Sequence, residues 1–324
     1  MKHRQKPSPI LENHPLQRQG GRNRHFSKVR FKRELPLYFL MLPGILFFII
    51  YRYIPMYGIV MAFQDFRLVK GFSGSEWVGL KHFKDFFSSA FFPIVMKNTL
   101  IISLGKLLLG FPAPIILALM LNEVRQKRIK KTLQTVVYLP HFVSWVVIGN
   151  LISIFFGVGN GVIPTLFKEW FGVEVTWLID GWPFRILLIL SDIWKNVGWG
   201  TIIYMAALSG VDPALYEAAA LDGASRWRQI LHVTLPCLIP LITINLILRI
   251  GGILDTGFEQ LLVLQNKMVY MDSVTIEMYA YNRGFVNANY GFGAAVGLFQ
   301  SVAGLVMVML ANWFAKRYSD GGLV

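Results

Sequence analysis

Charged residues are scarce in this sequence. Only 15% of its 324 residues are charged, while 54% are hydrophobic, whereas in an average soluble domain about a quarter of the residues are charged. This shortage argues against a cytosolic globular protein and indicates that lipid surrounds much of the chain. Cys237 is the single cysteine, which excludes a disulfide framework and a cysteine-based zinc site.

Motifs that mark common enzymes are also missing. No G-x-x-x-x-G-K-[ST] phosphate loop occurs, so we do not expect this chain to bind ATP by that route. The six histidines form no H-E-x-x-H pattern, and no G-x-S-x-G elbow is present. The run from Gly291 to Gly297 lacks dinucleotide-binding spacing and is better explained by close packing of transmembrane helices. We therefore expect no catalytic residue, no metal site and no cofactor in this chain.

Six long apolar stretches are present instead. Each of them has the roughly 20 residues that a helix needs to cross about 30 Å of hydrocarbon. They cover residues 37–63, 93–121, 136–157, 184–208, 237–257 and 290–315. The sequence therefore predicts an all-α, polytopic membrane protein with six transmembrane helices. The Trp-rich segment 164–183 is predicted to be an amphipathic element at the outer interface.

Positive charge is distributed unevenly between these stretches. The N-terminal tail, the connections 122–134 and 209–236 and the C-terminal end together hold 19 Lys and Arg residues, against seven in the other three connections. Because Lys and Arg accumulate on the cytoplasmic side, both termini are predicted to be cytoplasmic. The formal charge of +14 is thus a topology signal, and we expect no nucleic acid partner. The tail either only fixes this topology or also binds anionic lipid.

This pattern divides the chain into three parts. They are a basic cytoplasmic tail (1–34), a six-span domain (35–315) and a short cytoplasmic C-terminal tail (316–324). Within the second part, the connection 210–236 is longer than a simple link between helices needs to be. Connections of this length often have a function of their own, which directs attention to its residues.

Helix signals are strong in the connection 210–236. Asp212 and Pro213 form a good helix start, and Gly223 supplies the left-handed residue that ends the helix. A second short helix is predicted from about Ser225 to Leu235, with the next proline marking the return to the membrane. The sequence therefore predicts a helix–turn–helix on the cytoplasmic face. Its small and acidic residues suit a close contact with a basic groove of a partner; they are Glu217, Ala218, Ala219 and Asp222.

The same residues resemble a known family. Glu217-Ala218-Ala219, then Gly223, then Leu235-Pro236 resemble the E-A-A loop of the permease subunits of ABC importers, although Val233 stands where the family usually has Ile. The string Y-E-A-A-A-L-D-G-A-S-R-W is similar to carbohydrate importers of the maltose type. The string Y-L-P-H-F-V-S-W at residues 138–145 further resembles importers of alginate or aldouronate oligosaccharides. Trp194-Lys195-x-x-Gly198 is a supporting match, and the resemblance covers about residues 35–315.

This resemblance implies a partner set and a mechanism. Such a permease lies in the bacterial inner membrane, surrounded by lipid, and forms a heterodimer with a homologous second permease. Two ATPase subunits hold ATP and Mg, and an extracytoplasmic solute-binding protein delivers the carbohydrate. The chain itself is then no enzyme but forms half of the translocation path. The E-A-A loop is the coupling helix between the fourth and fifth spans, with Glu217, Ala218, Ala219, Asp222 and Gly223 at the ATPase.

Cations also occur inside the predicted spans. Lys106, Lys195 and Arg249 lie near mid-membrane by position, where each charge costs about 2.5–3.5 kcal/mol. They are expected to face a partner helix, an ion pair or a wet path, and Asp192, three residues before Lys195, is the expected partner of that lysine. Either these three cations line the translocation path of an acidic, uronate-containing oligosaccharide, or they only form structural pairs. Four aromatic residues either stack on sugar rings or simply pack: Trp145, Trp194, Trp199 and Tyr204.

Three alternatives to a carbohydrate importer are weighed, one of which, a membrane structural or signalling protein, is disfavoured by the loop at 210–236. The same permease architecture serves other solutes, such as glycerol phosphate or polyamines. A secondary transporter driven by an ion gradient is a different class, and it needs intramembrane carboxylates but no loop for an ATPase. The loop at 210–236 and the scarcity of acidic residues in the spans argue against the secondary transporter.

Overall fold

The computed structural model describes the backbone of residues 28–318 and the side chains of residues 35–317. The chain forms two units, residues 1–57 and residues 58–324, which we describe separately. Most of the predicted basic tail 1–34 lies outside the described residues. Helix α1 begins within that predicted tail, at Lys28.

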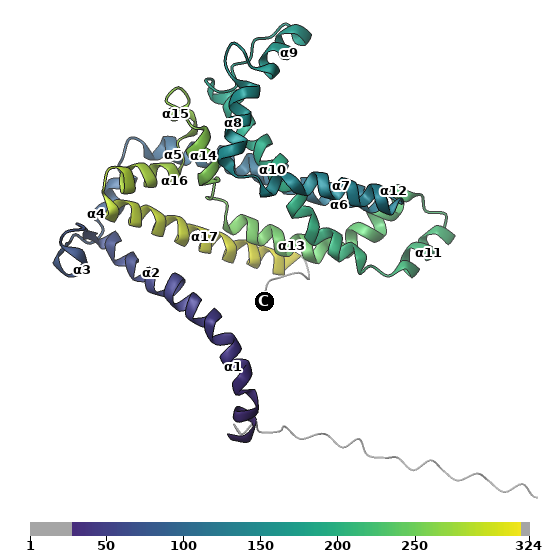
Figure 1. Cartoon of the computed structure of the whole chain (residues 1–324), viewed down its shortest axis with the longest axis horizontal. Helices are drawn as coiled ribbons and strands as arrows, with labels where there is room; N and C mark the ends of the chain where they lie inside the picture. The colour runs from purple at the N-terminus through teal and green to yellow at the C-terminus, as the bar shows by residue number, and fades with distance from the viewer. Residues whose placement is uncertain (1–27, 319–324) are drawn as a thin grey trace, which may run out of the picture. The chain divides into compact units, whose positions relative to one another are not determined.

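The first unit is a nearly continuous apolar helix (Figure 1). Its described elements are α1 (Lys28–Phe48), the π-helical turn η1 (Ile49–Tyr53) and α2 (Ile54–Met56). The 3-10 helix η2 (Tyr57–Phe63) follows; its first residue belongs to the first unit and its other residues to the second. The stretch Leu35–Phe63 is long and apolar enough to cross a membrane. This agrees with the first predicted span.

The second unit contains four further helical stretches of membrane-spanning length: Phe92–Glu123, Gly181–Ser209, Arg226–Gly251 and Tyr290–Arg317. They are built from α5 (Phe92–Gly110) and α6 (Pro112–Glu123); α10 (Gly181–Ser209); α12 (Arg226–Gln229), η4 (Ile230–Thr234) and α13 (Leu235–Gly251); and α17 (Tyr290–Tyr318). These helices confirm the predicted stretches 93–121, 184–208 and 290–315. The helix predicted at 237–257 begins earlier, at Arg226, and ends at Gly251.

The predicted span 136–157 is not one straight helix. The segment formed by α7 (Lys127–Tyr138) and η3 (Leu139–Phe142) meets α8 (Trp145–Phe156) at an angle of 99°. Ser144 caps α8, because its hydroxyl accepts a hydrogen bond from the Val147 amide at 3.4 Å. With 12 residues, α8 is only about 18 Å long and does not cross the hydrocarbon alone. The described residues thus contain five helices of spanning length, or six if the bent pair forms one span.

Shorter elements connect the long helices. A small antiparallel hairpin pairs Gln64 with Trp77 and Asp65 with Glu76. The helix α9 (Val162–Phe171) overlaps the predicted amphipathic segment 164–183, begins two residues before it and ends at Gly172, whose φ is +67°. The remaining elements are β1 (Gln64–Asp65), α3 (Gly71–Gly74), β2 (Glu76–Trp77), α4 (Lys81–Phe87), α11 (Pro213–Leu221), α14 (Phe258–Leu264), α15 (Tyr270–Ser273), α16 (Ile276–Ala280) and η5 (Tyr281–Val286).

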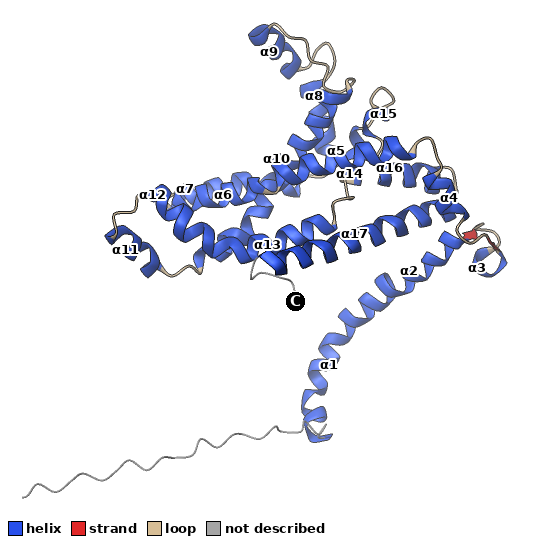
Figure 2. Ribbon diagram, turned by 180° about the vertical axis from the view of Figure 1, so that it is seen from behind, coloured by secondary structure: helices blue, strands red, loops and turns tan. Residues whose placement is uncertain are grey.

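Helix α10 is the centre of the second unit, and it packs against α5, α6, α7 and α13. In Figure 2, α11 lies at one end of this unit and α4 near the other, with α8 and α9 projecting from the middle. One hydrophobic cluster contains Phe86, Phe184 and Phe292, and a second contains Tyr204 and Leu238. A fully buried side chain of this size contributes about 1.5–3 kcal/mol to stability. These clusters hold α10 in place, so the side chains on its different faces point into different surroundings.

Candidate functional site

The predicted helix start and turn in the connection 210–236 are present in the structure. The Asp212 carboxylate accepts a hydrogen bond from the Ala214 amide at 2.9 Å at the start of α11. At its end, the amides of Ala224 and Gly223 donate to the carbonyls of Ala219 and Ala220 at 2.9 and 3.0 Å, which is the Schellman pattern. Gly223 has a φ of +75°, so its left-handed conformation is confirmed.

The surface of α11 is open. Glu217, Ala218, Asp222 and Gly223 are exposed, while Ala219 is half-buried. Within the described part of the chain, neither acidic side chain has a hydrogen-bond or ion-pair partner. Two large apolar side chains are also exposed beside them, Leu221 at 89% and Trp227 at 68%. The loop therefore presents small, acidic and apolar residues together, a composition that suits a protein partner.

The second helix of this connection differs from the prediction. It does not end before Pro236; instead α12, η4 and α13 form one helix from Arg226 to Gly251. The π-helical turn η4 lies directly before the first turn of α13, which contains Pro236, and a local widening of this kind accommodates a proline that lacks its N–H. The Tyr216 and Thr234 hydroxyls are 3.0 Å apart and join α11 to this helix.

Two polar cavities lie at the other end of the same helix. Their volumes are about 240 and 370 Å³, and Asp192, Asn196 and Arg249 line both of them. Asp192 and Asn196 are four residues apart on α10 and share one face of it. Asn245, one turn before Arg249 on α13, lines the larger cavity. The long helix 226–251 therefore connects the loop that contains α11 to these cavities over about 35 Å.

Arg249 is the exposed cation of this site. Among the described residues, its guanidinium has no hydrogen-bond or ion-pair partner, although it lines both cavities. A planar guanidinium of this kind can bind a carboxylate through two parallel hydrogen bonds. The prediction of Arg249 as a path residue is thus compatible with its position.

Lys106 has a different environment and is only 6% exposed. Its ammonium donates to the Thr256 carbonyl at 2.8 Å and to Gln260 Oε1 at 2.6 Å, and it lies 3.3 Å from Asp192 Oδ1. Gln260 in turn donates to the Leu188 carbonyl at 2.8 Å. Although Lys106 also lines the smaller cavity, these contacts use its three N–H groups. It therefore ties α5 and α10 to α14 and to the segment before it.

Lys195 is also held by the protein. Its ammonium donates to the carbonyls of Val143 and, at 2.9 Å, of His141, where the bent pair α7–η3 and α8 is broken. Its expected partner Asp192 instead contacts Lys106, so the predicted Asp192–Lys195 pair is wrong. Lys195 is absent from the lining of both polar cavities.

Gly198 explains the rest of the W-K-x-x-G motif. A Cβ atom there would lie 1.9 Å from the Val137 carbonyl oxygen and 3.0 Å from the Tyr138 amide nitrogen. The backbone of α7 therefore passes directly over this glycine, one turn along α10 from Lys195. The motif therefore allows α10 to pack tightly against the bent pair. Lys195 donates hydrogen bonds to carbonyls of the bent pair, and Gly198 has no side chain that would collide with the backbone of α7.

The four aromatic candidates lie in different places. Trp199 stacks on His141 at 4.6 Å between ring centroids, is 50% exposed and lines the larger polar cavity. Tyr204 lines the same cavity but is 4% exposed, and Trp145 is buried. Trp194 lines a separate, apolar cavity. Trp199 is thus the aromatic side chain best placed to stack on a sugar ring.

Sequence reasoning missed the amide and hydroxyl groups around these cations. Asn196 donates to Asp192 Oδ1 at 3.2 Å, and Thr256 donates to Glu277 Oε2 from both its amide and its hydroxyl at 3.0 Å. Burial raises the pKa of the Glu277 carboxyl, and the charge of Asp255 raises it further. Polar residues four apart in an apolar stretch, such as Asp192 with Asn196 and Asn245 with Arg249, are the signal that could have indicated this site.

The family described as "Binding-protein-dependent transport system inner membrane component" matches residues 110–320. This is more than half of the chain. The chain belongs to this family. It is a multi-pass protein of the bacterial membrane with several apolar helices of spanning length.

The relatives narrow the assignment. The permease is 44% identical to Protein LplB of Bacillus subtilis over 292 residues, which is 90% of this chain and 92% of that protein. It is also 44% identical to the polygalacturonan/rhamnogalacturonan transport system permease protein YteP of the same bacterium, over 89% of each chain. An arabinooligosaccharide transport permease, AraP of Halalkalibacterium halodurans, is 30% identical over 81% of each chain. These relatives make the chain a carbohydrate-type permease.

Solved structures agree with this assignment. A bacterial ABC transporter involved in import of the acidic polysaccharide alginate contains a chain with a TM-score of 0.81 and 40% identity, covering 90% of this permease and 98% of that chain. A second structure, with a TM-score of 0.82 and 39% identity over 91% and 99%, is such a transporter in complex with an alginate pentasaccharide-bound periplasmic protein. The permease is therefore a subunit of a sugar or oligosaccharide ABC importer.

Proposed function

We propose that this permease forms half of the translocation path for an acidic, uronate-containing oligosaccharide. Two similar transport systems are described as carrying polygalacturonan/rhamnogalacturonan and alginate, and polygalacturonan and alginate are both polymers of uronic acids. Carboxylate groups of such a substrate need a cation that no protein group already holds. Arg249, exposed in both polar cavities, is the cation that meets this requirement, and this observation carries the proposal.

The neighbours of Arg249 suit a sugar. Asn196 and Asn245 provide amide groups for hydroxyls, and Trp199 provides a half-exposed ring for stacking. Asp192 would repel an acidic substrate, but its charge is offset by Lys106 at 3.3 Å. The larger cavity thus combines one available positive charge with groups that bind neutral parts of an oligosaccharide, whereas Asp255, an exposed carboxylate, lines only the smaller cavity.

The energy comes, in this proposal, from ATP that separate subunits hydrolyse. ATP and Mg are held by two ATPase subunits, and α11 lies in a groove of one of them, with Glu217, Ala218, Ala219, Asp222 and Gly223 at the contact. Movement of α11 passes through the Tyr216–Thr234 contact into helix 226–251, which carries Arg249. A rigid-body change of this kind opens the path alternately to each side. A homologous second permease supplies the other half of the path, and an extracytoplasmic solute-binding protein delivers the oligosaccharide.

Both termini are cytoplasmic in this arrangement, which requires the bent pair to form one crossing. Single cysteines at Arg128 and Glu169, in a Cys237→Ala background, test the orientation. A membrane-impermeant maleimide added to intact cells is expected to label position 169 and not position 128. Labelling of position 128 alone would contradict the proposed topology.

The coupling step is tested with two pairs of variants in proteoliposomes that contain the assembled importer. Ala218→Trp blocks docking by its size, and Ala218→Ser is its control. Gly223→Val opposes the left-handed turn, whereas Gly223→Asn tolerates it. The bulky variants are expected to insert normally but to lose uptake and ATPase co-purification, while both controls retain them. Normal substrate-stimulated ATP hydrolysis in both bulky variants would contradict the role of this loop.

A further inference from the structure

His141 contacts two residues that line the larger polar cavity, although it does not line that cavity itself. Its ring stacks on the Trp199 indole, with 4.6 Å between centroids and 6° between the ring planes. Its Nδ1 lies 3.1 Å from Asn196 Oδ1. Trp199 and Asn196 are three residues apart on α10, so they share one face of this helix. One imidazole therefore contacts both of these neighbouring side chains in the cavity wall.

The hydrogen bonds around Asn196 fix the direction of its amide. The carboxylate of Asp192, paired with Lys106, only accepts hydrogen bonds, so the Asn196 atom 3.2 Å from it is the Nδ2 donor. Asn196 Oδ1 then faces His141, whose Nδ1 must carry the donated proton. The second N–H of Asn196 Nδ2 has no acceptor within the described chain, and Asn196 lines both cavities. Its amide therefore offers a ligand a donor and not an acceptor.

The stack leaves one face of the Trp199 indole for a ligand. His141 covers the other face, because the two rings are nearly parallel. Phe142 lies 5.7 Å from His141 and 5.9 Å from Trp199 between centroids. These nearly equal distances place Phe142 beside the stack and not on the free face of the indole. Since Trp199 is 50% exposed and lines the larger cavity, a pyranose ring can stack on the face turned away from His141.

The backbone around His141 is held without its imidazole. Lys195 donates to the His141 carbonyl at 2.9 Å. Gly198 leaves room for the backbone of α7 to pack against α10. Neither contact uses the His141 side chain, so substitutions of His141 are expected to keep the bent pair in place.

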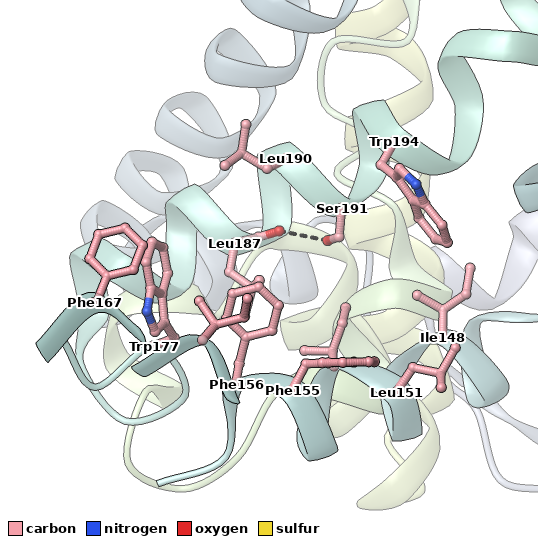
Figure 3. Close-up of a pocket in the computed structure, with 12 residues that line it drawn as sticks. Ile148, Leu151, Phe155, Phe156, Phe167, Trp177, Leu187, Leu190, Ser191 and Trp194 are labelled. Atoms are coloured by element: carbon pink, nitrogen blue, oxygen red, sulfur yellow. Dashed lines mark hydrogen bonds between the residues drawn. The ribbon is translucent and has the colours of Figure 1, made fainter. Parts of the chain in front are cut away.

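Another tryptophan of α10 has different surroundings. Figure 3 shows Trp194 in the wall of an apolar cavity, across from Ile148 and Leu151 of α8. The hydroxyl of Ser191, a polar group in this lining, already donates to the Leu187 carbonyl at 2.6 Å. Because the hydroxyls of a sugar need polar partners, this cavity does not offer a sugar site.

We propose that His141 is a positioning residue of the sugar site. Its imidazole holds the plane of the Trp199 indole and the direction of the Asn196 amide. A pyranose ring then stacks on the indole, while one of its hydroxyl oxygens accepts the free N–H of Asn196. Both interactions are independent of the charge of the substrate, unlike the contact of Arg249. This inference rests on the proposed function of the polar cavities as the sugar path, but not on the acidity of the sugar.

Equilibrium dialysis of two trisaccharides against the assembled importer, without its solute-binding protein, tests this role. The probes are α-1,4-linked trigalacturonate, which is acidic, and α-1,4-linked galactotriose, which is neutral. His141→Ala is expected to raise both dissociation constants by the same factor, at least about fivefold. The control Leu139→Ala, at a residue of the same 3-10 helix that is 63% exposed, leaves both constants unchanged. Melting temperatures of both variants should equal that of the native importer.

Conservative variants separate the two contacts of the imidazole. His141→Asn keeps a donor near Asn196 without the stacked ring, and His141→Phe keeps a ring on Trp199 without the donor. Each is expected to bind both probes about two- to fivefold more tightly than His141→Ala. In a Trp199→Ala/Asn196→Ala background, His141→Ala should change the dissociation constant of trigalacturonate less than about twofold, because its effect passes through those two residues.

The outcomes distinguish this inference from the proposed function. Unchanged binding of both probes by His141→Ala would overturn the inference and leave the role of Arg249 intact. A full loss in the Trp199→Ala/Asn196→Ala background would overturn it as well, since His141 would then contact the sugar directly. Equal weakening of both probes by Arg249→Gln would contradict an acidic substrate but not the role of His141. No binding of either probe by the native importer would contradict both.

Discussion

Lys106 and Lys195 are held inside the helical bundle, whereas Arg249 is exposed to two cavities. The lysines are 6% and 8% exposed. Lys195 donates to backbone carbonyls, whereas Lys106 donates to one backbone carbonyl and to the side chain of Gln260 and lies 3.3 Å from the Asp192 carboxylate. Arg249 has no such partner among the residues that the structure describes. Position within an apolar stretch therefore does not decide what a cation does. The groups that surround it decide whether it holds helices together or remains available for a ligand.

This difference has an energetic side. A buried ammonium loses its hydration, and hydrogen bonds and ion pairs must offset that cost. Lys106 obtains them from Thr256, Gln260 and Asp192, and Lys195 from the carbonyls at the break after η3. Removal of either lysine is thus expected to lower the stability of the permease. Removal of Arg249 is expected to alter transport and leave stability unchanged.

Gly198→Val should have the largest effect on stability. The new Cβ would overlap the Val137 carbonyl, 1.9 Å away, and backbone on both sides would have to separate, so we expect a loss of more than about 4 kcal/mol. Gly297→Val is the matched control, because a Cβ at that helical glycine meets nothing within 4 Å. Thermal unfolding and size-exclusion profiles in detergent measure both variants. Equal stability of the two would show that the contact between α7 and α10 does not need a glycine.

Lys106→Met should have the second-largest effect on stability. We expect the free energy of unfolding to fall by about 3–5 kcal/mol, because the largely buried Asp192 carboxylate is left without its cation. Thermal or denaturant unfolding in detergent provides the measurement. The double variant Lys106→Met/Asp192→Asn is expected to recover part of this loss, since it removes the unpaired charge. A loss below about 1 kcal/mol in the single variant would mean that the pair contributes little.

Lys195→Met is expected to cost less, about 2–3 kcal/mol, because neutral carbonyls and no charge are left without a partner. These carbonyls belong to His141 and Val143, which adjoin the break in the bent pair. Proteolysis near residue 143 should therefore also become faster in the variant. Lys97→Met on the same bundle is the control, since Lys97 is exposed. Should both variants unfold alike, Lys195 would not stabilise the break.

Glu277→Gln should have the smallest effect, and it depends on pH. The pKa of Glu277 is raised by burial and by Asp255, so the folded state binds a proton more tightly than the unfolded state, whose pKa is about 4.3. Its contribution to the free energy of unfolding is therefore fully present below pH 4.3, approximately, and decreases as pH rises through the raised pKa. The variant should lose this dependence and be slightly more stable than the native chain at pH 8. Melting temperatures from pH 4 to 8 that stay parallel would contradict the raised pKa.

Local signals predicted the start and the end of α11 well. Asp212, Pro213 and Gly223 define the start and end of α11 through interactions within a few residues, and such interactions can be deduced from sequence alone. The break in the bent pair also had a local signal, Pro140 followed by Ser144, but the apolar length of 136–157 outweighed it. The continuous helix 226–251 differs from the prediction because Pro236, a boundary signal in the sequence, lies inside it, in the turn directly after the π-helical turn η4.

The partners of the cations could not be predicted in this way. Lys106 meets Thr256 and Gln260 across 150 and 154 residues, and Lys195 meets His141 across 54. Sequence spacing suggested Asp192 as the partner of Lys195, since both lie on α10 within one turn. The tertiary structure instead directs Asp192 to Lys106. Contacts between distant segments therefore decided which of the three predicted path residues remained available.

Arg249→Gln provides the most direct test of the central claim, that Arg249 contacts the charge of an acidic substrate. Uptake into proteoliposomes is measured for an acidic and a neutral oligosaccharide of equal length, together with the melting temperature of the variant. We expect acidic uptake to fall at least tenfold, as for the loss of a hydrogen bond to a charged group of about 1.5–3 kcal/mol. Neutral uptake and melting temperature should remain unchanged, and Arg249→Lys should restore part of the acidic uptake. Equal loss for both substrates, or no loss for either, would contradict the claim.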